Sequence, residues 1–268
     1  MKMQDGLQST DTAPTHWKNA VKHSRLGGRL VQWRNAWRLH RWTAEDNRAA
    51  AFYRNFVEPG NLCFDIGANL GARIKVFRRL GASVVAVEPQ EYCLAVLKPA
   101  YWLDRKVRIV GAACGESVGA SKIMLADESL LSTLSTDWIA DTRASGRFTQ
   151  TKWDREQSCE VTTLDSLVQA YGAPRFIKID VEGYELEVLR GLSRPVPSLS
   201  FEFLPERFER TSQCIRRLMD IGFSEFNFSL EESFSLFQPN WVTADDLMAV
   251  LRRVNPAVFG DVYARTAI

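Results

Sequence analysis

The chain has 268 residues, of which 46% are hydrophobic and 25% charged, and its formal net charge is +2. A chain of this length and composition can bury one substantial core, so we expect a single α/β domain with an N-terminal extension. No apolar run approaches the roughly 18 residues of a membrane span, which argues against an integral membrane protein.

Residues 1–15 contain no hydrophobic stretch of the signal-peptide type, and we expect a cytoplasmic protein. The cysteines lie far apart, form no C-x-x-C pair and are odd in number. This spacing indicates neither a zinc site nor a disulfide framework, and it fits small buried cysteines in a reducing compartment. We therefore expect no metal ligands among the cysteines.

The N-terminal region is basic and rich in tryptophan. Residues 1–15 are polar without periodicity, which predicts a disordered tail, and residues 16–56 have the spacing of a helical extension. Residues 1–54 hold ten Lys or Arg but only four acids. A helix packed on the domain through its Trp face is the interpretation we favour. Capping of the cofactor or substrate cleft and contact with nucleic acid or an anionic membrane are the alternatives.

The main domain is expected over residues 57–268, beginning with a turn at residues 58–61. An apolar strand over residues 62–66 is followed by a glycine turn, a helix over residues 70–80 and a β-branched strand over residues 83–87. This succession predicts a doubly wound α/β fold, with a mostly parallel sheet and helices on both faces.

The glycine turn and the acid after the second strand predict a nucleoside site. Gly67 and Gly71 let the backbone turn and approach a ligand, and Glu88-Pro89 places a carboxylate where it can accept both hydroxyls of a ribose. The turn reads G-x-x-x-G and lacks the middle glycine of the dinucleotide pattern G-x-G-x-x-G. This favours a ligand without phosphates, which S-adenosylmethionine (SAM) would fit. The alternative is a purely structural turn.

Further elements follow in alternation to the C-terminus. Residues 111–119 form a small-residue loop, and residues 129–158 are the least regular segment, a candidate lid in which Ser132, Thr133 and Ser135 could contact substrate. Expected helices cover residues 91–97 (broken by Pro99), 164–171, 184–192 and 211–221, with a last helix capped by Thr243. Expected strands cover residues 107–110, 121–125, 175–179, 199–203, 223–228, 233–237 and 261–265.

Three acids are candidates for the chemistry at the carboxyl edge of the sheet. Asp180 and Glu182 follow the strand over residues 175–179, and Glu202 lies near the end of the next strand. All three histidines precede residue 57, so a carboxylate is the expected base, with Asp180 the first candidate. A divalent cation held by these acids is an alternative, as is a structural role such as helix capping by Glu182. Lys178 is expected to pair with one of them.

Considered together, the segment around the glycine turn and the segment around Asp180 resemble the FkbM-type family of SAM-dependent methyltransferases. The matching segments are FDIGAN at 64–69, VEP at 87–89, TLDSL at 163–167 and FIKIDVEGYELEVLRG at 176–191, with weaker matches at FEF (201–203) and GDVYA (260–264). The resemblance covers about residues 57–264. It implies a class I methyltransferase fold, SAM as cofactor, and O-methylation of a sugar, glycolipid or natural-product hydroxyl.

The resemblance also implies cofactor-binding residues. They map onto Asp65, Gly67, Ala68, Asn69, Gly71 and Glu88, with Pro89 next to them and Cys114 near the place of the adenine. One departure is Ile74, which stands where the family usually carries Thr or Ser, and the lost hydroxyl could weaken cofactor binding.

The expected partner is a small-molecule or glycan acceptor, and we do not expect nucleic acid. A methyltransferase of RNA or protein, an NAD-dependent oxidoreductase and a SAM-binding protein without turnover remain the alternatives. Neither the acceptor nor the oligomeric state follows from the residues.

Overall fold

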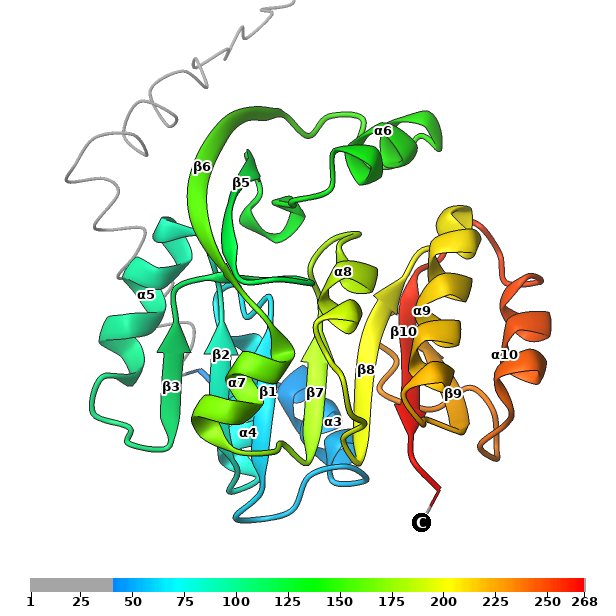
Figure 1. The fold of residues 1–268 in the computed structure, drawn as a ribbon, viewed down its shortest axis with the longest axis horizontal. Helices are drawn as coiled ribbons and strands as arrows, with labels where there is room; N and C mark the ends of the chain where they lie inside the picture. Colours follow the sequence, from blue (N-terminus) through cyan, green and yellow to red (C-terminus); the bar gives the residue numbers. More distant parts are fainter. Residues whose placement is uncertain (1–40, 268) are drawn as a thin grey trace, which may run out of the picture.

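The computed structural model describes residues 41–267 and is built on a seven-stranded sheet in the order β3-β2-β1-β7-β8-β10-β9 (Figure 1). Strand β10 runs antiparallel to both of its neighbours, and the remaining strand pairs of this sheet are parallel. The predicted doubly wound α/β fold is confirmed. The strands are β1 Leu62–Ile66, β2 Ser83–Val87, β3 Val107–Val110, β7 Phe176–Ile179, β8 Ser198–Phe203, β9 Glu225–Leu230 and β10 Gly260–Arg265.

Helices cover both faces of this sheet, and the strand residues alternate between two separate cores. In β1, Cys63 packs in the core with α3, α4 and α5, whereas Phe64 and Ile66 pack in the core with α7 to α10. Because both faces are buried, β1 and β2 are mostly apolar, with Asp65 and Ser83 as their polar residues. The helices are α3 Ala44–Tyr53, α4 Ala72–Arg79, α5 Glu91–Tyr101, α7 Leu164–Tyr171, α8 Glu185–Arg190, α9 Phe208–Asp220 and α10 Ala244–Leu251, with a short 3₁₀ turn at Pro205–Arg207.

A second, three-stranded sheet stands above the carboxyl ends of the main sheet (Figure 1). It consists of β4 Ala113–Cys114, β5 Gly119–Ala126 and β6 Trp153–Thr162, with a 3₁₀ turn at Ser129–Leu131 and helix α6 Thr136–Ala144 between β5 and β6. The expectation that residues 129–158 are the least regular segment was therefore wrong in part. The Ser135 side chain caps α6, and β6 pairs with β5 although Asp154, Arg155 and Glu156 near its start are charged and exposed.

Two other predicted elements differ from the structure. Helix α5 continues through Pro99, whose missing N–H leaves the Ala95 carbonyl without a helical donor. Ala95 is exposed, so water can hydrate that carbonyl. The strand expected over residues 233–237 is absent from the described structure, because left-handed φ values at Glu231 and Phe234 (48° and 50°) interrupt the extended backbone.

The predicted tail and most of the predicted extension, residues 1–40, lie outside the described residues. The described part of the extension includes α3, which begins with a capping box at Thr43 and packs Phe52 and Tyr53 into the core. Within residues 41–267, no helix is both long and apolar enough to span a bilayer.

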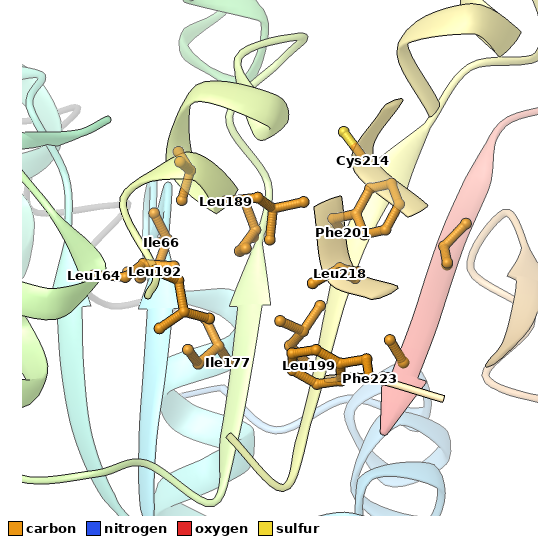
Figure 2. Close-up of a cluster of buried hydrophobic side chains, with 14 of the residues drawn as sticks. Ile66, Leu164, Ile177, Leu189, Leu192, Leu199, Phe201, Cys214, Leu218 and Phe223 are labelled. Carbon is orange, nitrogen blue, oxygen red and sulfur yellow. The ribbon is translucent and has the colours of Figure 1, made fainter. Parts of the chain in front are cut away.

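Leu199 shows how much stability the sheet core supplies. It lies in β8 with no exposed surface, surrounded by Ile177, Leu218 and Phe223 (Figure 2). We expect Leu199→Ala to lower the free energy of unfolding by about 2–5 kcal/mol, because it leaves a cavity that the neighbours cannot fill. Urea unfolding measures this. Leu103→Ala, at a side chain that is 76% exposed, is the matched control and should change stability by less than about 0.5 kcal/mol.

Candidate functional site

A cavity of about 400 Å³ opens at the carboxyl ends of β1, β2, β7 and β8, below the second sheet. This is the edge at which open α/β sheets bind ligands. All of the predicted cofactor-binding residues and acids except Gly71 line it. Of the three predicted substrate contacts, Ser132 lines it, whereas Thr133 and Ser135 do not. The lining set is Asp65, Gly67, Ala68, Asn69, Glu88, Pro89, Cys114, Asp180, Glu182 and Glu202.

The glycine turn after β1 is folded tightly against β2 and β7. The N–H groups of Gly67 and Ala68 donate to the Val87 carbonyl at 2.9 and 3.1 Å. Gly67 and Gly71 both have a φ of 82°, a conformation that favours glycine, and Gly71 is the N-cap of α4. A Cβ atom on Gly67 would lie 1.8 Å from the Asp180 carbonyl oxygen. The turn therefore brings the predicted cofactor side of the cavity against the predicted acceptor side.

Glu88 is buried, and both of its carboxylate oxygens are held by backbone donors. The N–H of Asn69 donates to Oε2 and the N–H of Gln90 to Oε1, each at 2.8 Å. Burial raises the pKa of Glu88 to about 7, although these hydrogen bonds act to lower it. Each carboxylate oxygen can accept more than one hydrogen bond, so two hydroxyl groups of a ligand could still bind here.

Asp65 presents a buried oxygen without a donor. The residue is 2% exposed, and its Oδ2 has no hydrogen-bond partner among residues 41–267. Burial raises its pKa to about 7, against the attraction of Arg73 and Lys178. A buried carboxylate oxygen at the wall of a cavity can accept a hydrogen bond from an ammonium or hydroxyl group of a ligand.

Asp180, Glu182 and Glu202 come together from two neighbouring strands. One carboxylate oxygen of each lies within 4.8 Å of the others, and a cation could be held by the same three oxygens. The Asp180 side chain is 39% exposed and lies 3.2 Å from the Lys178 ammonium, so the predicted pairing of Lys178 with an acid is confirmed. The cluster can therefore position a polar group or receive a proton.

Glu182 and Glu202 are the strongly perturbed members of this cluster. Burial raises the pKa of both side chains well above the usual range, and repulsion from Asp180 raises them further. A carboxylate with a raised pKa is a stronger base near neutral pH than a free glutamate. The cluster thus contains one aspartate paired with the Lys178 ammonium and two glutamates that hold a proton more tightly than a free glutamate does.

Glu185 and Thr133 stabilise the turn that carries Glu182. The N–H groups of Gly183 and Val181 donate to Glu185 at 3.0 and 3.3 Å, so Glu185, rather than Glu182, satisfies this turn before α8. The hydroxyl of Thr133 donates to the Glu182 carbonyl at 2.6 Å. Thr133 therefore holds the backbone of Glu182, which has a left-handed φ of 52°.

The family model of the methyltransferase FkbM domain matches residues 65–232, which is more than half of the chain. The chain belongs to the FkbM methyltransferase family. The match spans both halves of the cavity, from Asp65 to Glu232. For this FkbM methyltransferase, the family assigns the class I methyltransferase fold and SAM as the cofactor.

Solved structures that resemble this FkbM methyltransferase are distant in sequence. Precorrin-6y C5,15-methyltransferase from Geobacter metallireducens is 10% identical, with 83% of this chain and 87% of that chain covered and a TM-score of 0.43. A TehB-like SAM-dependent methyltransferase from Corynebacterium glutamicum is 11% identical, with 90% and 97% covered and a TM-score of 0.45. Aeropyrum pernix fibrillarin, with natively bound SAM, is 11% identical, with 81% and 73% covered and a TM-score of 0.44. A search of curated proteins found no match.

Ile74, the residue that departs from the family pattern, lies in the core of this FkbM methyltransferase. Its side chain has no exposed surface and packs with the α3–α5 core, whereas its neighbour Arg73 lines the cavity. The Arg73 guanidinium donates two hydrogen bonds of 2.8 Å to the carboxylate of Glu232, which lies 159 positions later in the chain. Isoleucine at position 74 therefore faces the core. The cavity wall at this turn of the helix is formed by Arg73 instead.

Several residues of the wall carry no signal in the sequence. Leu130, 63% exposed, and Phe148 supply apolar surface to the cavity wall, and Arg147 is held by Glu206 at 2.5 Å. These residues come from the segment that was expected to be irregular. Its predicted role as a specificity element is compatible with their place on the cavity wall.

Glu202 should make the stability of the FkbM methyltransferase depend on pH. Because its folded pKa is raised, the folded chain keeps a proton that the unfolded chain releases above about pH 4.5. Rising pH should therefore destabilise the wild type relative to Glu202→Gln, and the difference should grow as the pH rises from about 4.5 toward the raised folded pKa. Urea unfolding of both proteins across this range measures it. A difference that is constant or shrinks with pH would contradict the prediction.

Proposed function

We propose that this protein is a SAM-dependent O-methyltransferase that acts on a hydroxyl group of a sugar, glycan or small natural product. The observation that carries the proposal is the shared cavity in which the buried carboxylate of Glu88 and the cluster of Asp180, Glu182 and Glu202 face the same space. One end suits a ribose and the other an acceptor that must lose a proton.

On the cofactor side, Glu88 would accept the ribose hydroxyls, and Asp65 would accept a hydrogen bond through its unpaired Oδ2. Gly67, Ala68 and Asn69 would bring the backbone close to the ligand, and Pro89 and Cys114 would border the adenine. Gly71 does not line the cavity and would act by setting the N-terminus of α4. When bound, SAM supplies an electrophilic methyl group.

On the acceptor side, the chain has to align a hydroxyl oxygen and take up its proton. Alignment of two reactants can lower a barrier by about 7–11 kcal/mol. Asp180, whose side chain is 39% exposed, would orient the hydroxyl, and the proton would remain on the cluster that it forms with Glu182 and Glu202. Because the pKa values of the two glutamates are raised, the cluster can receive this proton at pH values at which it has already lost one of its own.

The charge of the cavity wall supports a small uncharged acceptor over RNA. Seven acidic residues and two arginines line the cavity. Both arginines already have a carboxylate partner, Arg73 in Glu232 and Arg147 in Glu206. A phosphate backbone would therefore meet repulsion near the acceptor acids and no free arginine in the described wall. Hydroxyl groups of a sugar can donate hydrogen bonds to the carboxylates.

Calorimetry with SAM, S-adenosylhomocysteine and NAD tests the cofactor assignment, and we expect binding of the first two. Incubation of cell extracts with the enzyme and SAM labelled in its methyl group, followed by mass spectrometry, tests the acceptor. A small molecule or glycan that gains one labelled methyl group on oxygen is the expected result. Preferential binding of NAD, or label found in RNA or protein, would overturn the proposal.

A further inference from the structure

Lys178 is a buried cation in the middle of the sheet. It lies in β7, whose four residues are all buried, and its side chain is 2% exposed. Burying an ammonium group costs several kcal/mol unless partners satisfy it. A lysine at this position therefore requires a reason beyond the packing of the sheet.

Two carboxylates, from different strands, hold the Lys178 ammonium. It donates to Asp261 Oδ1 on β10 at 2.8 Å and lies 3.2 Å from Asp180 Oδ2, just past β7. Strand β8 separates β7 from β10, and Ser200, a small residue, is opposite Lys178 in the register. The lysine thus crosses a strand to connect Asp261 with Asp180.

Asp261 is also tied to the acceptor acids through the sheet. It is the register partner of Glu202 on β8, and its Oδ2 accepts a hydrogen bond from the Tyr263 hydroxyl at 3.4 Å. The Asp180 carboxylate has one charged partner in the described chain, Lys178, and no hydrogen bond or ion pair holds the side chains of Glu182 and Glu202 there. Lys178 is therefore the contact that restrains the cluster.

We propose that Lys178, anchored by Asp261, is a positioning residue that holds the Asp180 carboxylate toward the acceptor. This inference rests on the proposed function, in which Asp180 orients the acceptor hydroxyl. The two distances to the ammonium fix one Asp180 oxygen on the sheet side and leave the other available to the cavity, which Asp180 lines. A misplacement of about 1 Å in such a group can cost about a hundredfold in rate.

Titratable groups of the neighbouring elements act on this arrangement. Asp180, Asp261 and Tyr53 on α3 favour the charged Lys178 ammonium, and Arg73 on α4 disfavours it. Asp65 on β1 and Glu185 on α8 repel the acids, whereas Arg73 on α4 and Lys178 attract Asp65. Lys178 also lowers the pKa of both Glu182 and Glu202, against burial and mutual repulsion. Removal of the ammonium should therefore shift the acidic limb of the pH–rate profile to higher pH, in addition to slowing the reaction.

The test compares Lys178→Met, Asp261→Asn and the wild type. We expect Lys178→Met to lower kcat by about a hundredfold and to shift the acidic limb upward, with SAM affinity within about threefold of the wild type. Asp261→Asn keeps the shape of the anchor and should lower kcat by about tenfold. Lys75→Met is the matched control, since Lys75 also pairs with an aspartate, Asp46 at 2.8 Å, but outside the cavity. It should stay within about twofold of the wild type.

The outcomes separate this inference from the proposed function. A wild type that binds SAM but methylates no hydroxyl defeats the proposed function. A wild type that is active, with kcat and pH profile unchanged in Lys178→Met, defeats the role of Lys178 alone. If Lys178→Met does not fold, nitrogen NMR of the Lys178 ammonium decides. Its resonance should move in both Asp180→Asn and Asp261→Asn, and a resonance that ignores either change would overturn the proposal.

Discussion

Gly67→Ala is expected to lower SAM affinity by more than about a hundredfold, because the new methyl group has no place in the folded site. Its Cβ would lie 1.8 Å from the Asp180 carbonyl oxygen, a backbone atom that cannot move without shifting the end of β7. The φ of 82° adds strain for any side chain. Calorimetry with SAM and S-adenosylhomocysteine measures the loss, and circular dichroism checks that the variant is folded.

Gly60→Ala is the control for the backbone part of this effect. Gly60 has a φ of 89°, and among the described residues no atom lies within 4 Å of the place that a Cβ would take. It should therefore share the conformational cost of about 1–2 kcal/mol in stability without the collision. SAM affinity should remain within about twofold of the wild type. If Gly67→Ala binds SAM as tightly as Gly60→Ala, the turn does not contact the cofactor.

Local patterns predicted the first half of the sheet closely. Strands β1 and β2 fall at the residues expected, because a strand buried on both faces leaves a short, mostly apolar run and the glycines of the turns bound it. The turn also placed Asp65 and Glu88 at the carboxyl edge, since consecutive parallel strands end at the same side of a sheet. The acids just after β7 and near the end of β8 reach the same cavity for the same reason.

Long-range partners could not be predicted in this way. The pairing of Arg73 with Glu232, and of Lys178 with Asp261, depends on the order of strands in the sheet, and nothing near either residue in the sequence specifies it. Strand β6 was not predicted, because it is stabilised by pairing with β5 and its sequence contains no apolar run. The perturbed titration of Glu202 arises only once burial and neighbouring acids are known.

Asp180→Asn is expected to lower kcat by about 10²–10⁴-fold, the range that general bases contribute. Asparagine keeps the shape of the side chain and can accept a hydrogen bond, but it cannot take up a proton, and it loses the charge that pairs with Lys178 at 3.2 Å. SAM affinity should change little, because we propose that this side chain faces the acceptor. Initial rates with methyl-labelled SAM and the acceptor found in extracts, together with calorimetry, measure both quantities.

The matched control is Asp220→Asn, at the exposed end of α9, which should leave kcat within about twofold. A comparison with Glu182→Gln and Glu202→Gln then locates the proton. If Asp180→Asn retains nearly full activity while one glutamine variant loses it, the glutamate replaced in that variant is the base. Asp180 is then a neighbour of the base without a role in the proton transfer. If all three variants lose activity to a similar degree, the acids act as one unit, as their mutual distances within 4.8 Å lead us to expect.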